Sequence, residues 1–107
     1  MTKQILLIED EVNIAEAIRF ILSRDGWAIE VLTDGAGAEA AIARLRPDML
    51  ILDLMLPGQT GLEILTNLRA IPAYADLPVL MLTAKGQGRD REAAERAGGF
   101  GLYDQTL

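Results

Sequence analysis

The fold of this chain is constrained most by three short runs of apolar residues, at positions 5–8, 49–52 and 79–82. None of these runs alternates apolar with polar residues, which is typical of strands buried on both faces of a parallel sheet. The segments between them space their apolar residues three or four positions apart, as amphipathic helices do. Strands that alternate with helices form βαβ units, so the sequence predicts a parallel sheet with right-handed crossovers.

The remaining elements follow from turn residues and apolar spacing. We expect a further strand at residues 27–32 and helices at residues 13–23, 36–45, 62–71 and 89–97. The last stretch, residues 98–107, contains three glycines, has weak strand character and is followed by no helix. A chain of 107 residues is long enough for one domain with a single core.

Composition and charge exclude several classes of function. A formal net charge of −6 argues against a nucleic-acid-binding surface, which would need clustered Lys and Arg. Cysteine and histidine are absent, which removes disulfides, thiolate metal sites, and the commonest zinc ligand and general base. The N-terminus lacks the apolar region of a signal peptide, and no apolar run approaches membrane-spanning length. We therefore expect a cytoplasmic protein that binds neither nucleic acid directly nor a membrane.

Polar residues stand where the apolar runs end. Glu9 and Asp10 follow the first run, Asp53 follows the second, and Thr83 follows the third. In a parallel sheet the carboxyl ends of all strands lie on one edge, where α/β proteins bind their ligands. The sequence therefore predicts that these four residues lie together, although they are far apart along the chain.

Simpler explanations exist for the same acids. Asp10 or Asn13 could act as the N-cap of the following helix, since acids suit a helix N-terminus. Asp53 could merely begin the loop that Pro57 and Gly58 force into a turn. The capping interpretation of Asp10 is compatible with a role in binding.

The chemistry of the acids favours a hard divalent cation. Three carboxylates without histidine or cysteine suit Mg²⁺, which needs one or two carboxylates and fills its octahedron with other oxygens. An aspartate beside bound Mg²⁺ can also act as a nucleophile and form an acyl phosphate. The residue types therefore predict a Mg²⁺-dependent phosphoryl site in which Asp53 is the acceptor. Thr83 would offer its hydroxyl to a phosphoryl oxygen.

Three motifs resemble the receiver domain of bacterial two-component response regulators, in the style of receivers that precede winged-helix DNA-binding domains. They are Ile-Leu-Leu-Ile-Glu-Asp-Glu from Ile5, Leu-Asp-Leu-Met-Leu-Pro-Gly from Leu52, and Met-Leu-Thr-Ala-Lys from Met81. In combination they are specific, and the resemblance covers residues 1 to about 99. It implies a flavodoxin-like, doubly wound five-strand parallel sheet of order 2-1-3-4-5, with a sensor histidine kinase as partner.

The resemblance also assigns roles to single residues. It implies that Asp53 is the phosphoacceptor and that Asp10 ligates Mg²⁺. Glu9 would act through waters of the metal, and the backbone carbonyl of Met55 would be a further ligand. Thr83 would be the switch residue that follows the phosphoryl group.

The chain departs from the family at its end, where a lysine-bearing strand and a fifth helix are normally found. Counted from Thr83, the lysine position holds Gln105, the aromatic position Leu102 and the proline position Thr106. Lys85 is a poor substitute, because it belongs to the preceding loop. We expect a degenerate last strand and no last helix.

One frameshift would explain this ending. A nucleotide inserted after the codon of residue 98 can convert a family-like ending, Gly-Ala-Ser-Asp-Tyr-Met-Thr-Lys-Pro-Phe, into the sequence of residues 98–107. The alternative is a natural or engineered degenerate terminus.

The leading interpretation is a phosphorelay receiver module, impaired by the lost lysine and helix, that is not a turnover enzyme. The alternative is a pseudo-receiver that keeps the fold and serves as a binding or dimerisation module. A third hypothesis is a small Mg²⁺-dependent phosphatase, but an enzyme of that kind would usually carry an aspartate where Met55 stands. Because a missing helix would leave apolar strands uncovered, we also expect a homodimer.

Overall fold

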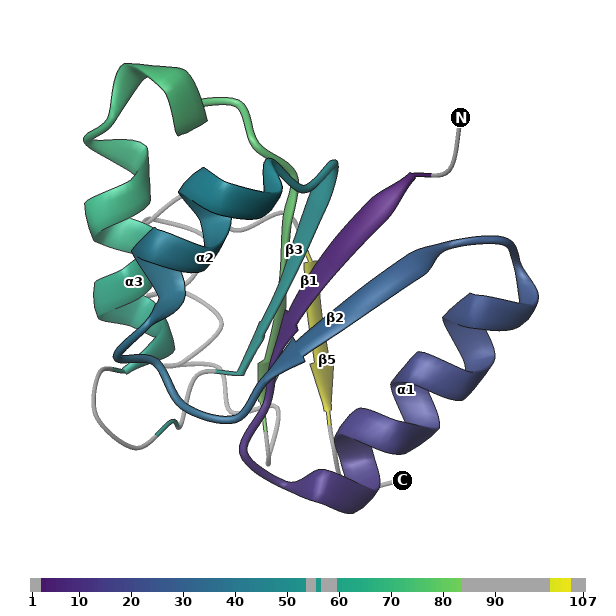
Figure 1. The fold of residues 1–107 in the computed structure, drawn as a ribbon. Coiled ribbons are helices and arrows are strands. Elements are labelled where there is room, and N and C mark those ends of the chain that lie inside the picture. Colours follow the sequence, from purple (N-terminus) through teal and green to yellow (C-terminus); the bar gives the residue numbers. More distant parts are fainter. Residues whose placement is uncertain (1–2, 54–55, 57–59, 84–100, 105–107) are drawn as a thin grey trace.

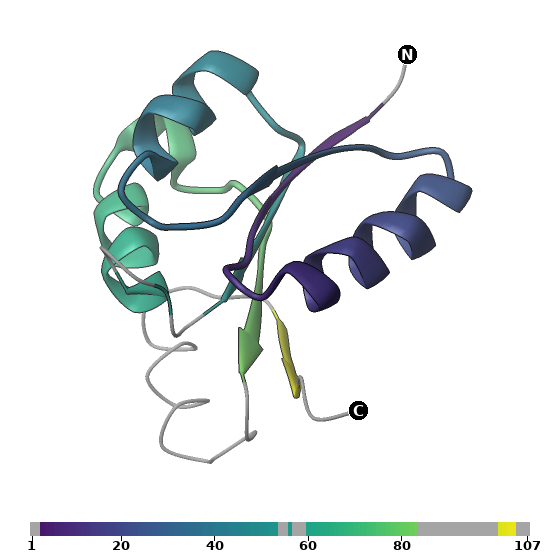
Figure 2. The same ribbon diagram turned by 60° about the horizontal axis from the view of Figure 1, so that its bottom comes forward.

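The chain forms a parallel sheet between two layers of helices, as the computed structural model shows (Figure 1). The structure describes residues 3–53, 56, 60–83 and 101–104, with only the backbone described for Thr83 and for 101–104. Helix α1 (Val12–Arg24) covers one face of the sheet, and α2 (Ala38–Leu45) and α3 (Gly61–Arg69) cover the other. The turned view in Figure 2 shows the same division, with α1 apart from α2 and α3.

The first four strands lie in the order β2-β1-β3-β4 and are all parallel. They are β1 (Gln4–Ile8), β2 (Ala28–Leu32), β3 (Met49–Asp53) and β4 (Val79–Thr83). Each lies within one residue of its predicted bounds, so the predicted flavodoxin-like α/β class with a parallel sheet is confirmed.

A short segment follows on the β4 side of the sheet. The backbone of β5 (Gly101–Asp104) pairs in parallel with β4, from Leu80 opposite Gly101 to Thr83 opposite Asp104. The predicted degenerate strand also involves residues outside those described, so its full extent stays a prediction. The predicted helix at 89–97 lies outside the described residues, and the missing last helix likewise stays a prediction.

Side chains of the inner strands point alternately to the two faces, and both faces are apolar. Leu6, Ile8, Leu50 and Leu52 pack in a cluster with α2 and α3. Ile5, Leu7 and Ile51 pack in a second cluster with α1. Because successive residues of a strand face opposite ways, burial on both faces requires the unbroken apolar runs of the sequence.

The α1 face is covered less completely than the other face. Met49 and Leu80 are only partly buried there, and α1 exposes three large apolar side chains. Val12, Phe20 and Ile21 are 60%, 65% and 60% exposed, respectively.

Among the described residues, no helix has the length and apolar character needed to cross a bilayer.

Three of the four predicted helices are found, with shifted ends. Helix α2 begins at Ala38 rather than at residue 36, because Ala36 donates its backbone N–H to the Asp34 carboxylate (2.9 Å) in a turn. Helix α3 ends at Arg69, because Ile71 precedes Pro72 and is extended (ψ 118°). Residues Pro72–Tyr74 then form the 3-10 turn η1.

The helix starts differ in how they are capped. Thr60 caps α3, since its hydroxyl accepts the backbone N–H of Glu63 (3.2 Å) and bonds the Glu63 carboxylate (3.2 Å). Helix α1 starts after Glu11, which makes no side-chain cap. The alternative role of Asp10 or Asn13 as N-cap is therefore wrong.

A reciprocal pair of hydrogen bonds joins the amino ends of β1 and β3. The backbone N–H of Gln4 donates to the Asp48 carboxylate (2.7 Å), and the N–H of Asp48 donates to the Gln4 carbonyl (2.7 Å). We call this pair the Gln4–Asp48 clamp. It lies just before the stretch in which Ile5 pairs with Met49.

Candidate functional site at the acidic edge

Neighbouring strands place three carboxylates at the carboxyl edge of the sheet. Glu9 and Asp10 follow the last residue of β1, and Asp53 is the last residue of β3. Ile8 pairs with Leu52, so the next residue on each strand is an acid. One carboxylate oxygen from each of Glu9, Asp10 and Asp53 lies within 4.8 Å of the others.

The three acids differ in their exposure to solvent. Glu9 is fully buried and Asp53 is 4% exposed, whereas Asp10 is exposed. The position of Glu9 is fixed by its backbone N–H, which donates to the Leu32 carbonyl at the end of β2 (2.9 Å). The cluster therefore has two carboxylates buried in the protein interior and one exposed to solvent.

Burial changes the titration of Glu9. The pKa of the Glu9 carboxyl is raised from 4.5 to about 8, chiefly by removal from water and next by a hydrogen bond with Asp53. The backbone N–H of Glu11, which donates to the Glu9 carboxylate (3.3 Å), acts in the opposite direction. Without a cation, the Glu9 carboxyl therefore keeps its proton near neutral pH, beside Asp53.

A divalent cation can replace this proton. Hard cations such as Mg²⁺ take carboxylate oxygens and keep several waters, which the exposed side of Asp10 leaves room for. The donor set is all oxygen, because the chain contains neither histidine nor cysteine. The residues present therefore fit Mg²⁺ better than a soft or imidazole-seeking metal.

The structure describes only part of the other predicted site residues. Thr83 ends β4 beside β3, where Leu82 pairs with Asp53, so its backbone lies at the same edge as the acids. Its side chain lies outside what the structure describes, as do Met55 and Gln105.

Two contacts at the site have no signal in the sequence. The N–H of Glu11 meets the Glu9 carboxylate, and the Leu32 carbonyl meets the N–H of Glu9. The first depends on how the backbone turns between β1 and α1, and no residue type marks that turn. The second continues the parallel pairing of β1 with β2, in which Ile8 lies opposite Leu32.

Comparison with known proteins identifies the family. The family model described as "Response regulator receiver domain" matches residues 5–103. The chain belongs to this family. Receiver domains bind Mg²⁺ at an acidic pocket, and the acidic cluster of this receiver domain occupies the carboxyl edge of its sheet.

Relatives and solved structures agree with this membership. The receiver domain is 44% identical over 95 residues to the probable transcriptional regulatory protein TcrX of Mycobacterium tuberculosis. This match covers 89% of the chain but only 40% of TcrX, so the chain spans two fifths of that relative.

Two solved structures are similar in fold. A putative response regulator from Chloroflexus aurantiacus matches with a TM-score of 0.95 and 29% identity, over 100% of this chain and 88% of that one. The BeF3-activated N-terminal receiver domain of Klebsiella pneumoniae RstA matches with a TM-score of 0.90 and 27% identity, over 98% of this chain and 87% of that one.

Proposed function

We propose that this receiver domain accepts a phosphoryl group on Asp53 in a phosphorelay, with Mg²⁺ bound at the acidic cluster. The observation that supports this most is the convergence of Glu9, Asp10 and Asp53 within 4.8 Å at the carboxyl edge of the sheet. A family neighbour activated with BeF3 supports a phosphoryl-type ligand in this fold. The chain then acts as a phosphoacceptor module in signalling and not as a turnover enzyme.

Each acid has a separate role in the proposal. Asp10 and Asp53 ligate Mg²⁺ directly, together with the backbone carbonyl of Met55. Glu9, which is fully buried, holds waters of the metal rather than the metal itself. Bound Mg²⁺ neutralises charge on the phosphoryl oxygens, which is the main requirement of phosphoryl transfer.

The transfer itself exchanges one bond to phosphorus for another. A carboxylate oxygen of Asp53 attacks the phosphorus atom, and the bond between phosphorus and the donor breaks. The donor is a phosphohistidine of a sensor histidine kinase, or acetyl phosphate in the test tube. Thr83 then contacts a phosphoryl oxygen and acts as the switch residue.

We propose that transfer or switching is impaired, because Gln105 occupies the position where the family has lysine. A lysine would neutralise phosphoryl charge in the transition state, and glutamine carries no charge to do so. Gln105 lies beyond the last residue of the family match, which ends at residue 103. Out-of-frame coding of residues 98–107 remains our explanation for this substitution.

We also propose a cytoplasmic location and a homodimer. The three exposed apolar residues of α1 (Val12, Phe20 and Ile21) support an interface on that face. We propose that residues 1–107 do not contact nucleic acid themselves, because their net charge is −6. Any role in transcription, as the name of TcrX suggests for that protein, would need a further domain.

The phosphoacceptor proposal is tested by incubation with acetyl phosphate and Mg²⁺, followed by intact mass spectrometry. We expect a single added phosphoryl group that disappears in Asp53→Asn. A matched control is Asp25→Asn, an exposed aspartate at the end of α1, which should still be modified. Modification that survives Asp53→Asn would refute the acceptor assignment.

The second candidate is a pseudo-receiver, favoured by glutamine at the lysine position. In that case acetyl phosphate gives no modification, while the domain still folds and self-associates. Gln105→Lys separates the two: an impaired acceptor gains a faster phosphorylation rate, whereas a binding module that has lost the chemistry shows no modification in either form.

A further inference from the structure

An open groove lies at the edge of the sheet opposite to the acidic cluster. It has a volume of about 440 Å³ and lies at the amino ends of β3 and β4. Asp53 stands at the other end of β3, one five-residue strand away, which is roughly 13 Å along the chain direction. The groove is therefore separate from the proposed phosphoacceptor site, and no step of the proposed function uses it.

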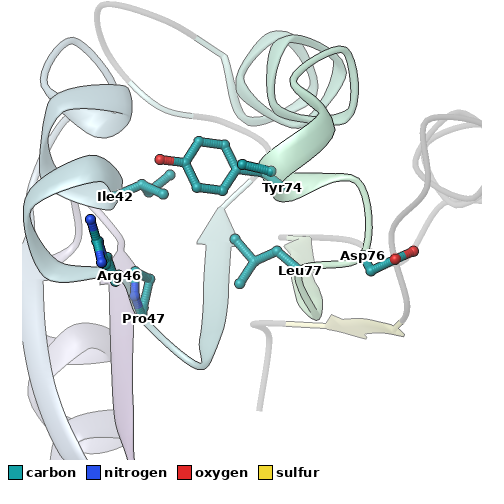
Figure 3. Close-up of a pocket in the computed structure, with 7 residues that line it drawn as sticks. Ile42, Arg46, Pro47, Tyr74, Asp76 and Leu77 are labelled. Atoms are coloured by element: carbon teal, nitrogen blue, oxygen red, sulfur yellow. The ribbon is translucent and has the colours of Figure 1, made fainter.

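Two segments form the walls of the groove, and most of the wall is apolar. Ile42 and Pro47 come from the end of α2 and the turn after it, and both are buried. Tyr74 and Leu77 come from η1 and the segment before β4, and both are half-buried. Figure 3 shows Tyr74 and Leu77 reaching across toward Ile42 and Pro47. Concave sites of this size with apolar walls are typical of small-molecule binding.

One cation, Arg46, lies at the edge of the groove. Arg46 makes no hydrogen bond or ion pair through its side chain within the part of the chain that the structure describes. Its neighbours differ: Arg44 pairs with Glu30 (2.8 Å), and Arg69 donates to the Tyr74 carbonyl (2.8 Å). As far as the described residues go, the donors of the Arg46 guanidinium group at this groove are therefore available to a ligand.

The backbone of Arg46 is unusual. It is in the left-handed conformation (φ 48°, ψ 59°) and is the one non-glycine residue with positive φ among those described. Glycine is the usual residue at this position after a helix, because a β-carbon makes the conformation strained. An arginine here thus carries a cost in stability that a glycine would avoid.

The other polar groups favour an anion at this side of the groove. In Figure 3 the Tyr74 hydroxyl points toward α2, and the Asp76 carboxylate points away from Arg46 and the other labelled side chains. Asp76 instead acts on Arg69, whose pKa burial lowers and Asp76 raises. The charge of Arg46 is thus not neutralised from the opposite wall.

We propose that this groove binds a small organic carboxylate with an apolar body. The carboxylate accepts hydrogen bonds from the Arg46 guanidinium and the Tyr74 hydroxyl, which are charge-assisted and therefore strong. The apolar body lies between Ile42, Pro47 and Leu77. The net charge of −6 opposes anions at long range, so affinity depends on these contacts, and we expect a Kd in roughly the low millimolar range.

The test uses three probes of the same shape and different charge. Phenylacetate, phenylacetamide and phenethylamine are titrated separately into the isotope-labelled chain in metal-free buffer, with backbone amide shifts followed by NMR. We expect phenylacetate to give saturable shifts at residues 46, 48 and 73–77, and to bind at least about fivefold more tightly than either other probe. No saturable shifts, or equal binding of all three probes, would overturn the proposal.

Two variants of Arg46 separate loss of binding from loss of folding. Arg46→Gln removes the charge and keeps the strained backbone, whereas Arg46→Gly removes the charge and relieves the strain. We expect both to lose phenylacetate binding at least about fivefold, while Arg46→Gly melts at a higher temperature than the original chain. Binding that persists in Arg46→Gln would show that the guanidinium is not the anion's partner.

Two further variants complete the test. Tyr74→Phe should weaken binding roughly two- to tenfold while keeping the apolar wall. Asp53→Asn should leave phenylacetate binding unchanged, so the outcome is independent of whether Asp53 accepts a phosphoryl group. Loss of binding in Asp53→Asn would place the anion at the acidic edge and overturn the assignment to the groove.

Discussion

Stability of the metal-free chain should depend on pH through one buried carboxyl group. The pKa of Glu9 is raised from 4.5 to about 8, chiefly because Glu9 is removed from water. The folded chain therefore binds one more proton than the unfolded chain between these pH values. The free energy of unfolding contributed by Glu9 is fully present below about pH 4.5 and is lost as pH rises toward about 8.

The size of the effect follows from the same shift. A difference between 4.5 and about 8, at roughly 1.4 kcal/mol per pKa unit, sets an upper limit of about 5 kcal/mol. The exposed Asp10 side of the cluster admits water and screens part of this energy. We expect a loss of roughly 2 to 4 kcal/mol between pH 5 and pH 8, which lowers Tm by about 10 to 20 °C.

The composition of the chain limits the number of other groups that could produce this pH dependence. No histidine is present, so few groups other than Glu9 and the terminal amine titrate between pH 5 and pH 8. Urea unfolding followed by circular dichroism, at constant ionic strength with a chelator, gives the free energy at each pH. Glu9→Gln should flatten the profile, and the exposed Glu16→Gln should leave it unchanged. Added Mg²⁺ should restore stability at pH 8, since the metal replaces the proton.

Two results would refute this reasoning. A profile that falls equally in Glu9→Gln and in the original chain would mean that another group carries the pH dependence. Stability that rises between pH 5 and pH 8 would mean that Glu9 is ionised in the folded chain, and that burial does not govern its pKa.

Three further outcomes are expected. Asp10→Asn should weaken Mg²⁺ binding about tenfold or more by calorimetry, and unchanged affinity would remove Asp10 from the metal site. Thr60→Ala should lower the free energy of unfolding by about 1 kcal/mol in urea, because the α3 cap is lost, whereas Thr66→Ala, whose hydroxyl only bonds the Leu62 carbonyl inside α3, should change it little. Light scattering should detect self-association at high micromolar concentration that Ile21→Glu abolishes; a stable monomer would contradict the proposed dimer.

Much of the sheet could be predicted because burial of a strand on both faces requires a pattern of residues that is visible in the sequence. A strand covered on both faces needs an unbroken apolar run, and Leu6 and Leu7 show why: they point to opposite clusters and are both fully buried. The placement of Glu9 and Asp53 at one edge could be predicted too, since the carboxyl ends of parallel strands share an edge.

Element ends and electrostatics were harder to predict. The early end of α3 had a signal, since Ile71 precedes a proline, but the prediction extended the helix to residue 71. The role of Asp34 in delaying α2 also depends on a local turn that competes with the helix. The raised pKa of Glu9 required knowledge of its burial, and the groove beside Arg46 required two loops that are distant in sequence.

The Gln4–Asp48 clamp sets the alignment of the acids from the far end of the sheet. It fixes which residue of β1 stands beside which residue of β3 at the amino edge. Sliding one strand by a single position would turn each of its side chains to the opposite face, and would place Ile8 or Asp10 beside Asp53 in place of Glu9. The exposed Asp48 at one edge of the sheet thus helps to determine which carboxylates stand side by side at the other edge, without contacting them.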